Sequence, residues 1–567
     1  MNRRAVTACL AFALPTGGAG VAAQPANPPA TRAAPVELPP IMVEESTSNV
    51  PWLYANAGGI EFLSRCSATT TRSLIEGWLA KMQLVRTLIP EAYLARTDVP
   101  EIFVLYGQDL RQTVSAEIQR ELQAGSERKG EAARREGVNI APSMRLHDRD
   151  MHASIAYIDE TLFDGANLTI ASGHVRYLLA GRVPDLPAWL VDGLERTYRR
   201  ADFLLDPITL GPLVWRNQRE SELASDPARP RALLPAHELF ASEARRAVEN
   251  QHPRRRQTRA SEQELFCRWA IASGVATRAA LWTFAARAAE EPVNEEMFEA
   301  CFGFDFAELR DRLSDYLPKA VNEIVWIDPG QRPSLPPFEI ERATPNQIAR
   351  VRGEWERLAI GHVQRRLPEV REPYLAQARR TLRRAWDAGD RDPRLLATMG
   401  LCEIDAGNEA AGREYLEPAI AAGVVRPRAY YELARLRFAA LRRDTTEAKR
   451  FSYTELAPVL QPLQRALTQS PPLPEVFGLL AEAWVRCEIP PHAGELAELA
   501  TGVRLFGRRP VVAYSLALAL ARHGKKAEAA AALDACLGHA TDESTEAGIK
   551  RLRAELAVEL AQPQSAP

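Results

Sequence analysis

Two histidines and two aspartates stand within six residues, in the segment His147-Asp-Arg-Asp-Met-His152. Imidazole and carboxylate groups are common metal ligands, so this spacing could hold a metal ion at the surface. A charged loop that enters a β-strand explains the same residues equally well, and we favour that interpretation. The metal site stays as an alternative.

Two other histidines begin metal-like patterns without a second ligand. On a helix, the residues three and four positions after His174 share its face, and these are Tyr177 and Leu178. His237 is followed four residues later by Ala241, where a zinc motif needs a second histidine. We interpret His174 as a structural or partly exposed histidine and His237 as a chance match. The sequence contains neither a Gly-Lys-Ser/Thr phosphate loop nor a Gly-x-Ser-x-Gly elbow.

The elements that position these residues follow from hydrophobic periodicity. The predicted elements are, in chain order, a helix over 52–90, a strand over 101–106, a helix over 109–124, a strand over 152–158 and helices over 166–180 and 188–198. The charged residues 125–150 predict a surface excursion, and the pattern from 199 to 320 is almost entirely helical.

Composition excludes some classes of partner. The 567 residues carry 71 basic and 73 acidic side chains, a formal net charge of −2, and 46% of them are apolar. This balance gives no reason to expect nucleic acid or an anionic membrane as partner. Arginines alternate with acids along helical segments, which predicts solvated helix faces.

The N-terminus predicts export. Arg3 and Arg4 precede an apolar run over 5–14 and a small-residue site at Val21-Ala-Ala23, as in a secretory signal peptide over 1–23. Residues 24–50 are rich in proline and alanine and predict a disordered leader. No later apolar run reaches the roughly 18 residues that a membrane span needs. We therefore expect a periplasmic or secreted bacterial protein without a transmembrane segment.

Six cysteines remain after removal of the signal peptide, and they are widely spaced. We expect buried free thiols, with one long-range disulfide such as Cys267–Cys301 as the alternative. They are Cys66, Cys267, Cys301, Cys402, Cys487 and Cys536.

A second proline-rich segment separates the two halves of the chain. Four prolines between Asp328 and Pro337 exclude a helix there and predict a linker over 327–344. Beyond the linker, small and large residues recur with a period of 34. Gly412 and Leu416 lie 34 residues after Ala378 and Leu382, and Gly400 lies 34 residues before Ala434. Small residues at two of these positions let paired helices approach closely, and leucines fill the space between them.

This spacing resembles tetratricopeptide repeats over 345–563. Insertions near 440–455 and 485–495 break the period, and a helical bundle without repeats is the alternative. The resemblance implies an α-solenoid of helical hairpins that binds a protein or peptide.

The first half resembles another family through short stretches around its predicted helices. The stretches are Val175-Arg-Tyr-Leu-Leu179, Pro187-Ala-Trp189, Asp192-Gly-Leu-Glu-Arg-Thr-Tyr198 and Cys301-Phe-Gly-Phe-Asp-Phe-Ala-Glu-Leu309. They are similar to the peptidase-MA-like group of gluzincin zinc metallopeptidases. The resemblance implies a gluzincin-like domain over 51–326, and hence a mainly α fold with a small α+β portion.

The catalytic positions of that family are altered here. By the resemblance, Ser172, Arg176 and Asp192 stand where the three zinc ligands belong, and Gly173 stands where the general base belongs. Glycine cannot move a proton, and the permanent charge of Arg176 repels a dication. We therefore expect no zinc, no cofactor and no catalytic residue, and a salt bridge between Arg176 and Asp192.

These expectations combine into a function. The chain is interpreted as an exported, non-catalytic pseudopeptidase whose repeat domain binds a protein or peptide partner. Two alternatives remain open. One is an active zinc-dependent peptidase that uses non-standard ligands, such as Asp192 with groups from 147–152. The other is a purely structural repeat scaffold.

Overall fold

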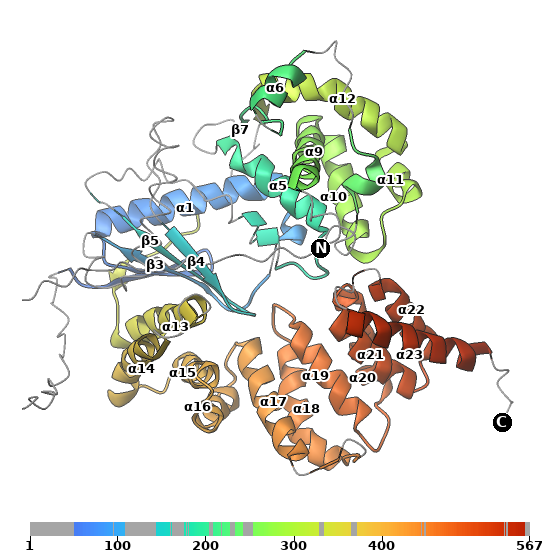
Figure 1. Ribbon diagram of the computed structural model, residues 1–567. Helices are drawn as coiled ribbons and strands as arrows, with labels where there is room; N and C mark the ends of the chain where they lie inside the picture. The colour runs from blue at the N-terminus through green and yellow to red at the C-terminus, as the bar shows by residue number, and fades with distance from the viewer. Residues whose placement is uncertain are drawn as a thin grey trace, which may run out of the picture. The chain divides into compact units, whose positions relative to one another are not determined.

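A mixed β-sheet organises the first part of the chain in the computed structural model (Figure 1). Among the described residues its strands follow the order β4-β5-β3-β2-β1-β9, with β2, β3 and β5 parallel and the other pairs antiparallel. The strands are β1 (Leu53–Ala57), β2 (Ile60–Ser64), β3 (Glu101–Tyr106), β4 (Ser143–His147), β5 (His152–Tyr157) and β9 (Glu341–Arg342). The two strands predicted over 101–106 and 152–158 are confirmed.

The structure describes most of the chain from residue 50 onward. The described residues are 50–94, 96–107, 143–158, 160, 175–176, 178–179, 181–202, 208–216, 218–226, 233–241, 253–327, 334–364, 371–443, 445–446, 449–537, 539 and 543–561. The predicted signal peptide, nearly all of the predicted leader and the predicted helix over 109–124 lie outside them, as does most of the predicted helix over 166–180.

The prediction of one helix from 52 to 90 is wrong in its first part. Residues 53–64 form the β1–β2 hairpin, and only α1 (Ala68–Leu88) is helical. Gly58 and Gly59 connect the strands with φ of +60° and +82°, the left-handed values that a two-residue hairpin turn requires. This turn chemistry outweighs a weak helical period in the surrounding residues.

Helices cover both faces of the sheet (Figure 1). Trp78 and other apolar residues of α1 pack on Phe62 and Phe103 on one face. On the other face, Val351 and Trp355 of α13 (Pro345–Gln364) pack on the opposite side chains of the same strands. Because side chains alternate between the two faces along each strand, the strands contribute residues to two separate hydrophobic cores.

A helical region with a small antiparallel sheet follows along the chain. Its helices are α5 (Ala188–Arg199), α6 (Gln218–Ala224), α7 (Ala236–Leu239), α9 (Pro253–Ala272), α10 (Val275–Glu290), α11 (Glu295–Phe302) and α12 (Phe306–Asn322). Its strands are β6 (Ala201–Asp202), β7 (Ile208–Leu210) and β8 (Val325–Ile327). The prediction of a helix over 188–198 is confirmed, whereas the nearly continuous helical pattern from 199 to 320 is interrupted by β6 and β7.

The segment predicted as a linker, 327–344, forms a short strand near its C-terminal end. Among its described residues, 334–340 form no helix, in agreement with the proline content. Glu341 and Arg342 form β9 and pair with Tyr54 and Leu53 of β1. The end of this segment is therefore a strand of the first sheet, and α13 starts directly after it.

The rest of the described chain is built of helices, most of which pack against a helix that is next to them in sequence. They are α14 (Arg371–Asp387), α15 (Pro393–Asp405), α16 (Glu409–Ala421), α17 (Pro427–Arg442), α18 (Tyr453–Leu467), α19 (Pro474–Val485), α20 (Ala493–Phe506), α21 (Pro510–Arg522), α22 (Lys526–Leu537) and α23 (Glu543–Ala561). The described part of the chain is thus mainly helical, with a small mixed sheet.

The predicted close approach of paired helices is confirmed between α15 and α16. A Cβ on Gly400 would lie 2.7 Å from Leu416, and a Cβ on Gly412 would lie 2.6 Å from Ile404. No larger side chain fits at either position unless its neighbour moves. The two predicted insertions meet each other, because Phe451 and Cys487 form an isolated β-bridge.

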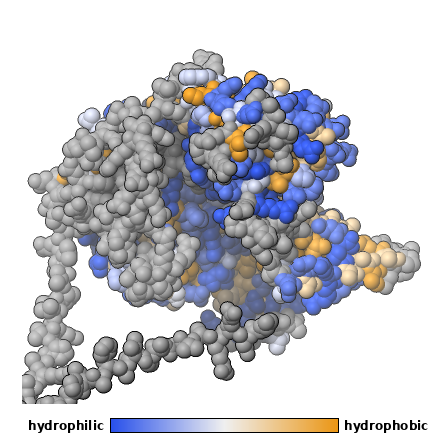
Figure 2. Space-filling model, turned by 45° about the horizontal axis from the view of Figure 1, so that its top comes forward, coloured by the Kyte–Doolittle hydropathy of each residue, from blue (hydrophilic) through white to orange (hydrophobic). Residues whose placement is uncertain are grey.

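The six cysteines beyond the predicted signal peptide are free thiols, and all are buried as predicted except Cys301, which is half-buried. The alternative of a Cys267–Cys301 disulfide is not formed. No described helix is both long and apolar enough to cross a bilayer. On the face shown in Figure 2, the described surface is mainly hydrophilic, and apolar residues form scattered patches.

Candidate functional site

Arg176 contacts two carboxylates of helix α5. Its Nη2 donates to Asp192, and its Nε donates to Glu195. Glu195 also accepts a hydrogen bond from Arg199 at 3.0 Å. The predicted Arg176–Asp192 salt bridge is confirmed, and Ser172 and Gly173 lie outside the described residues. Glu195 was not predicted, although its place three residues after Asp192 puts it on the same helical face.

Close packing of its buried side fixes the position of helix α5, which carries these carboxylates. Trp189 is buried, with its ring 5.0 Å from that of Phe240 and 5.5 Å from that of Phe284. Gly193 faces α9 so closely that a Cβ would lie 2.6 Å from both Cys267 Sγ and the carbonyl oxygen of Gln263. This packing fixes Asp192 and Glu195 on the exposed side of the helix.

The electrostatics of this cluster do not fit a zinc ion. Burial lowers the pKa of Arg176, but the hydrogen bonds that it donates to Asp192 and Glu195 outweigh this effect, and the net shift is upward. The guanidinium therefore stays charged, and a dication beside it would be repelled. Among the described residues, no group of three or more His, Cys, Asp or Glu side chains is placed to hold a metal ion.

A cavity of about 580 Å³ opens beside Arg176. We call it the Arg176 cavity. Its walls come from the β4–β5 turn, from residues 181–185 and from the segment 471–475 before α19. Its volume lies within the usual range for ligand pockets. Residues that are distant in sequence therefore line one space around Arg176.

Polar side chains of β3, β4 and β5 form one wall of the Arg176 cavity. Burial raises the pKa of Glu101 to about 7 against the opposing charge of Arg145, and burial lowers the pKa of His152 to about 3. The rings of His147 and His152 lie 6.3 Å apart, and Ser154 Oγ donates to Glu101 at 3.5 Å. Near neutral pH this wall therefore holds a neutral histidine beside a carboxyl group that is close to half protonated.

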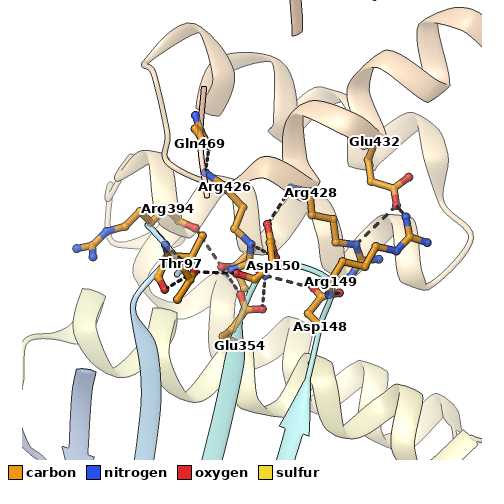
Figure 3. A network of polar contacts seen from close by, with 12 residues as sticks. Thr97, Asp148, Arg149, Asp150, Glu354, Arg394, Arg426, Arg428, Glu432 and Gln469 are labelled. Atoms are coloured by element: carbon orange, nitrogen blue, oxygen red, sulfur yellow. Dashed lines mark hydrogen bonds and ion pairs between the residues drawn. The ribbon is translucent and has the colours of Figure 1, made fainter. Parts of the chain in front are cut away.

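The two aspartates between these histidines pair with buried arginines (Figure 3). Asp148 accepts from Arg428 at 2.6 Å and also pairs with Arg357 and Arg426. Asp150 pairs with Arg426 at 3.1 Å and accepts from the backbone N–H of Arg428 at 2.8 Å. A charged loop entering a strand is the correct description. The expected surface excursion is wrong for Asp148 and Asp150, whose side chains are only 6% and 0% exposed.

The aspartates belong to a buried group of charges that we call the arginine network. It consists of Arg357, Arg426 and Arg428 with Asp148, Asp150, Glu354 and Asp405. Arg426 and Arg428 flank Pro427 at the start of α17, so the helix start aims both guanidiniums at the β4–β5 turn. The prediction of solvated arginines on helix faces is wrong here.

Compensating charges keep the arginine network ionised. Burial alone raises the pKa of Asp148, but the charges of Arg357, Arg428 and Arg426 hold it well below its usual range. The same competition lowers the pKa of Glu354 to about 2. For Asp150 burial outweighs Arg426, and the pKa is raised.

A second cavity of about 580 Å³ lies among α17, α19 and α21. We call it the repeat groove. Aromatic and charged residues line it, including Tyr431, Phe438, Arg442 and Glu482. Arg442 donates to Glu482 across the groove at 2.5 Å. The groove therefore offers a mixed apolar and charged surface, which suits side chains of both kinds.

Comparison with known proteins gives no match, either to a model of a protein family or to a curated protein sequence.

Proposed function

We propose that the chain is an exported, non-catalytic protein that binds polypeptide through a pseudopeptidase domain and a repeat domain. One observation carries the proposal, namely that Arg176 pairs with both Asp192 and Glu195. In the resembling family, a metal ion would bridge these helices. In this chain a guanidinium makes the bridge, and it brings neither a Lewis acid nor a group that could activate water.

The non-catalytic assignment rests on charge and on geometry. A dication at this position would face a fixed positive charge that cannot deprotonate at physiological pH. The remaining carboxylate ligand, Asp192, already has a partner in Arg176. Residues 51–326 therefore keep the outline of a gluzincin-like domain without its chemistry.

The binding role rests on the two cavities. The Arg176 cavity and the repeat groove each have a volume that suits a bound ligand segment, and both mix guanidinium, carboxylate and apolar surface. Helical hairpins over 345–563 that resemble tetratricopeptide repeats would present such a groove to a peptide.

The alternatives have less support. A peptidase with non-standard ligands needs Asp192 and groups from 147–152, yet Asp148 and Asp150 are bound by buried arginines. A purely structural scaffold does not account for two cavities of this size. Export is proposed from the signal-like N-terminus, and the N-terminal residue of the mature protein tests it, with residue 24 expected.

Metal analysis tests the non-catalytic assignment. We expect purified wild-type protein to contain no stoichiometric zinc. The quadruple variant Ser172→His, Gly173→Glu, Arg176→His, Asp192→Glu should gain about one zinc per chain, because it restores three ligands on the same helices. The matched control keeps Arg176 and carries the other three changes, and it should gain none. Stoichiometric zinc in the wild-type protein would overturn the assignment.

Recovery of partners tests the binding role. The mature chain is used to pull down proteins from an extract of exported proteins, and captured partners are then measured against the purified chain by calorimetry. Saturable binding of a polypeptide supports the proposal. Absence of any saturable polypeptide binding would leave only the structural scaffold.

A further inference from the structure

The Arg176 cavity and the repeat groove have a wall in common. Pro474 and Glu475, at the start of α19, line both spaces. The two cavities are therefore neighbours on either side of one helix terminus. Arg149 lies at the tip of the β4–β5 turn and lines the Arg176 cavity.

Arg149 reaches across this junction (Figure 3). Its Nη1 lies 3.6 Å from Glu432, and its Nε lies 3.5 Å from Glu475. Its guanidinium carbon also lies 5.3 Å from the ring centroid of Tyr431, a residue of the repeat groove. One side chain from the sheet thus touches three residues of the repeat helices at the point where the two cavities meet.

The contacts of Arg149 differ in kind from those of its neighbours. Asp148 and Asp150 are buried in the arginine network and fix the backbone of the turn. Arg149 keeps 38% of its side chain exposed, and its ion pairs are long. The half-exposed pair with Glu475 contributes about 1 kcal/mol or less, and the buried Glu432 keeps Arg435 as a partner at 2.7 Å. A ligand can therefore displace the Arg149 side chain while the turn stays in place.

We infer that the Arg176 cavity and the repeat groove form one channel for a single extended polypeptide, with Arg149 as a movable side chain at their junction. The inference rests on the proposed function and deepens it. A compact small molecule would fill one cavity and leave the other empty. An extended chain passes the junction, and its varied side chains suit a path lined by guanidinium, carboxylate, proline and aromatic groups.

The test uses the mature full-length chain and two pools of random-sequence peptides. The pools have lengths of about 6 and about 20 residues, which extend over roughly 20 Å and 70 Å. Each peptide carries a fluorophore and a photoreactive benzophenone at each end. Anisotropy gives affinity and stoichiometry, and mass spectrometry locates the crosslinks.

The channel predicts one long peptide per protein, crosslinked to both cavities. Linking two subsites in one ligand should make the long pool bind about a hundredfold more tightly than the short pool. Gly478→Trp fills the repeat groove from a position where a Cβ meets no atom within 4 Å. It should remove most of this advantage and weaken crosslinking of long peptides in the Arg176 cavity as well. Arg149→Ala should speed association of the long pool only.

The matched control is Gly494→Trp, because Gly494 is equally open but exposed on α20. It should change nothing. Two long peptides bound independently, or cavity crosslinks that survive Gly478→Trp unchanged, would overturn the single channel while peptide binding itself stands. Failure of both pools to bind would overturn the proposed function together with the channel.

Discussion

At the scale of the residue, Arg176 is well placed to pair with two carboxylates, but these pairs contribute little to the stability of the protein. It contacts two carboxylates, but 49% of its own side chain is exposed, and water competes for each contact. Pairs of this kind contribute little to stability even when their geometry is good. The side chain therefore contributes little to the stability of the fold.

We expect Arg176→Ala to lower the free energy of unfolding by less than about 1 kcal/mol, because the pair is half exposed. Urea unfolding followed by circular dichroism measures it. Arg199→Ala is the matched control, since Arg199 pairs with the same Glu195 and is 57% exposed. A loss several times larger for Arg176 alone would show that it holds the helices together.

The raised pKa of Glu101 predicts that the stability of the protein falls as the pH rises. Its folded pKa is raised from 4.5 to about 7, so between these values the folded state binds more protons than the unfolded chain. Its contribution to stability is therefore present below about pH 4.5 and is lost as the pH rises to about 7. Glu101→Gln cannot titrate, so its stability relative to the wild type should increase over this interval. Urea midpoints measured at several pH values check this, and a constant difference between the two proteins would contradict it.

The sequence predicted part of the residue-scale picture. The Arg176–Asp192 pair followed from two altered positions on neighbouring helices, and Glu195 could have followed from its spacing. The partners of Asp148 and Asp150 could not, because they lie more than 200 residues away along the chain. Local patterns carry no information about such contacts.

At the scale of the element, the α5–α9 pair depends on one glycine. The approach of Gly193 to Gln263 and Cys267 leaves no room for a methyl group, and one of the two clashes is with backbone. Backbone atoms cannot give way as a flexible side chain can.

We expect Gly193→Ala to destabilise the protein by about 1–3 kcal/mol through overpacking. Gly478→Ala is the matched control within helix α19, where a Cβ meets open space. That change should instead stabilise by about 0.5–1 kcal/mol, since alanine suits a helix interior better than glycine. Thermal unfolding of both variants measures the contrast, and equal effects would refute the packing argument.

Elements were predictable where their pattern is local and strong. The strands over 101–106 and 152–158 and the helix from 188 stand as predicted, and the close approach at Gly400 and Gly412 followed from repeated small residues. The β1–β2 hairpin was missed because its Gly58-Gly59 turn was not weighed against a weak helical period. Strand β4 was not predicted, because the charged residues in and around it do not form the apolar pattern of a buried strand.

At the scale of the whole molecule, the arginine network joins the sheet to three helices of the repeat region. Its seven members come from the β4–β5 turn and from α13, α15 and the start of α17. Burying these charges is costly, and their mutual pairing offsets that cost only while every partner is present.

We expect Asp148→Asn to destabilise the protein by about 3–5 kcal/mol, because three buried arginines lose a shared counter-charge. Asp534→Asn removes an exposed pair with Arg553 and should lower stability by less than about 1 kcal/mol. Urea unfolding compares the two. The double variant Asp148→Asn, Arg428→Met should lose less than the two single variants added together, and simple additivity would mean that the charges act independently.

The same network also has a consequence for the order of events during synthesis. Asp148 and Arg426 are separated by 278 residues. At a typical elongation rate, the turn that carries Asp148 leaves the ribosome about 14 to 56 seconds before its partner exists. During that time water solvates Asp148 and Asp150 at little cost in free energy. An apolar turn of the same length would be exposed to aggregation for the same time. The two carboxylates therefore stay hydrated until the helices that carry their arginine partners have been made.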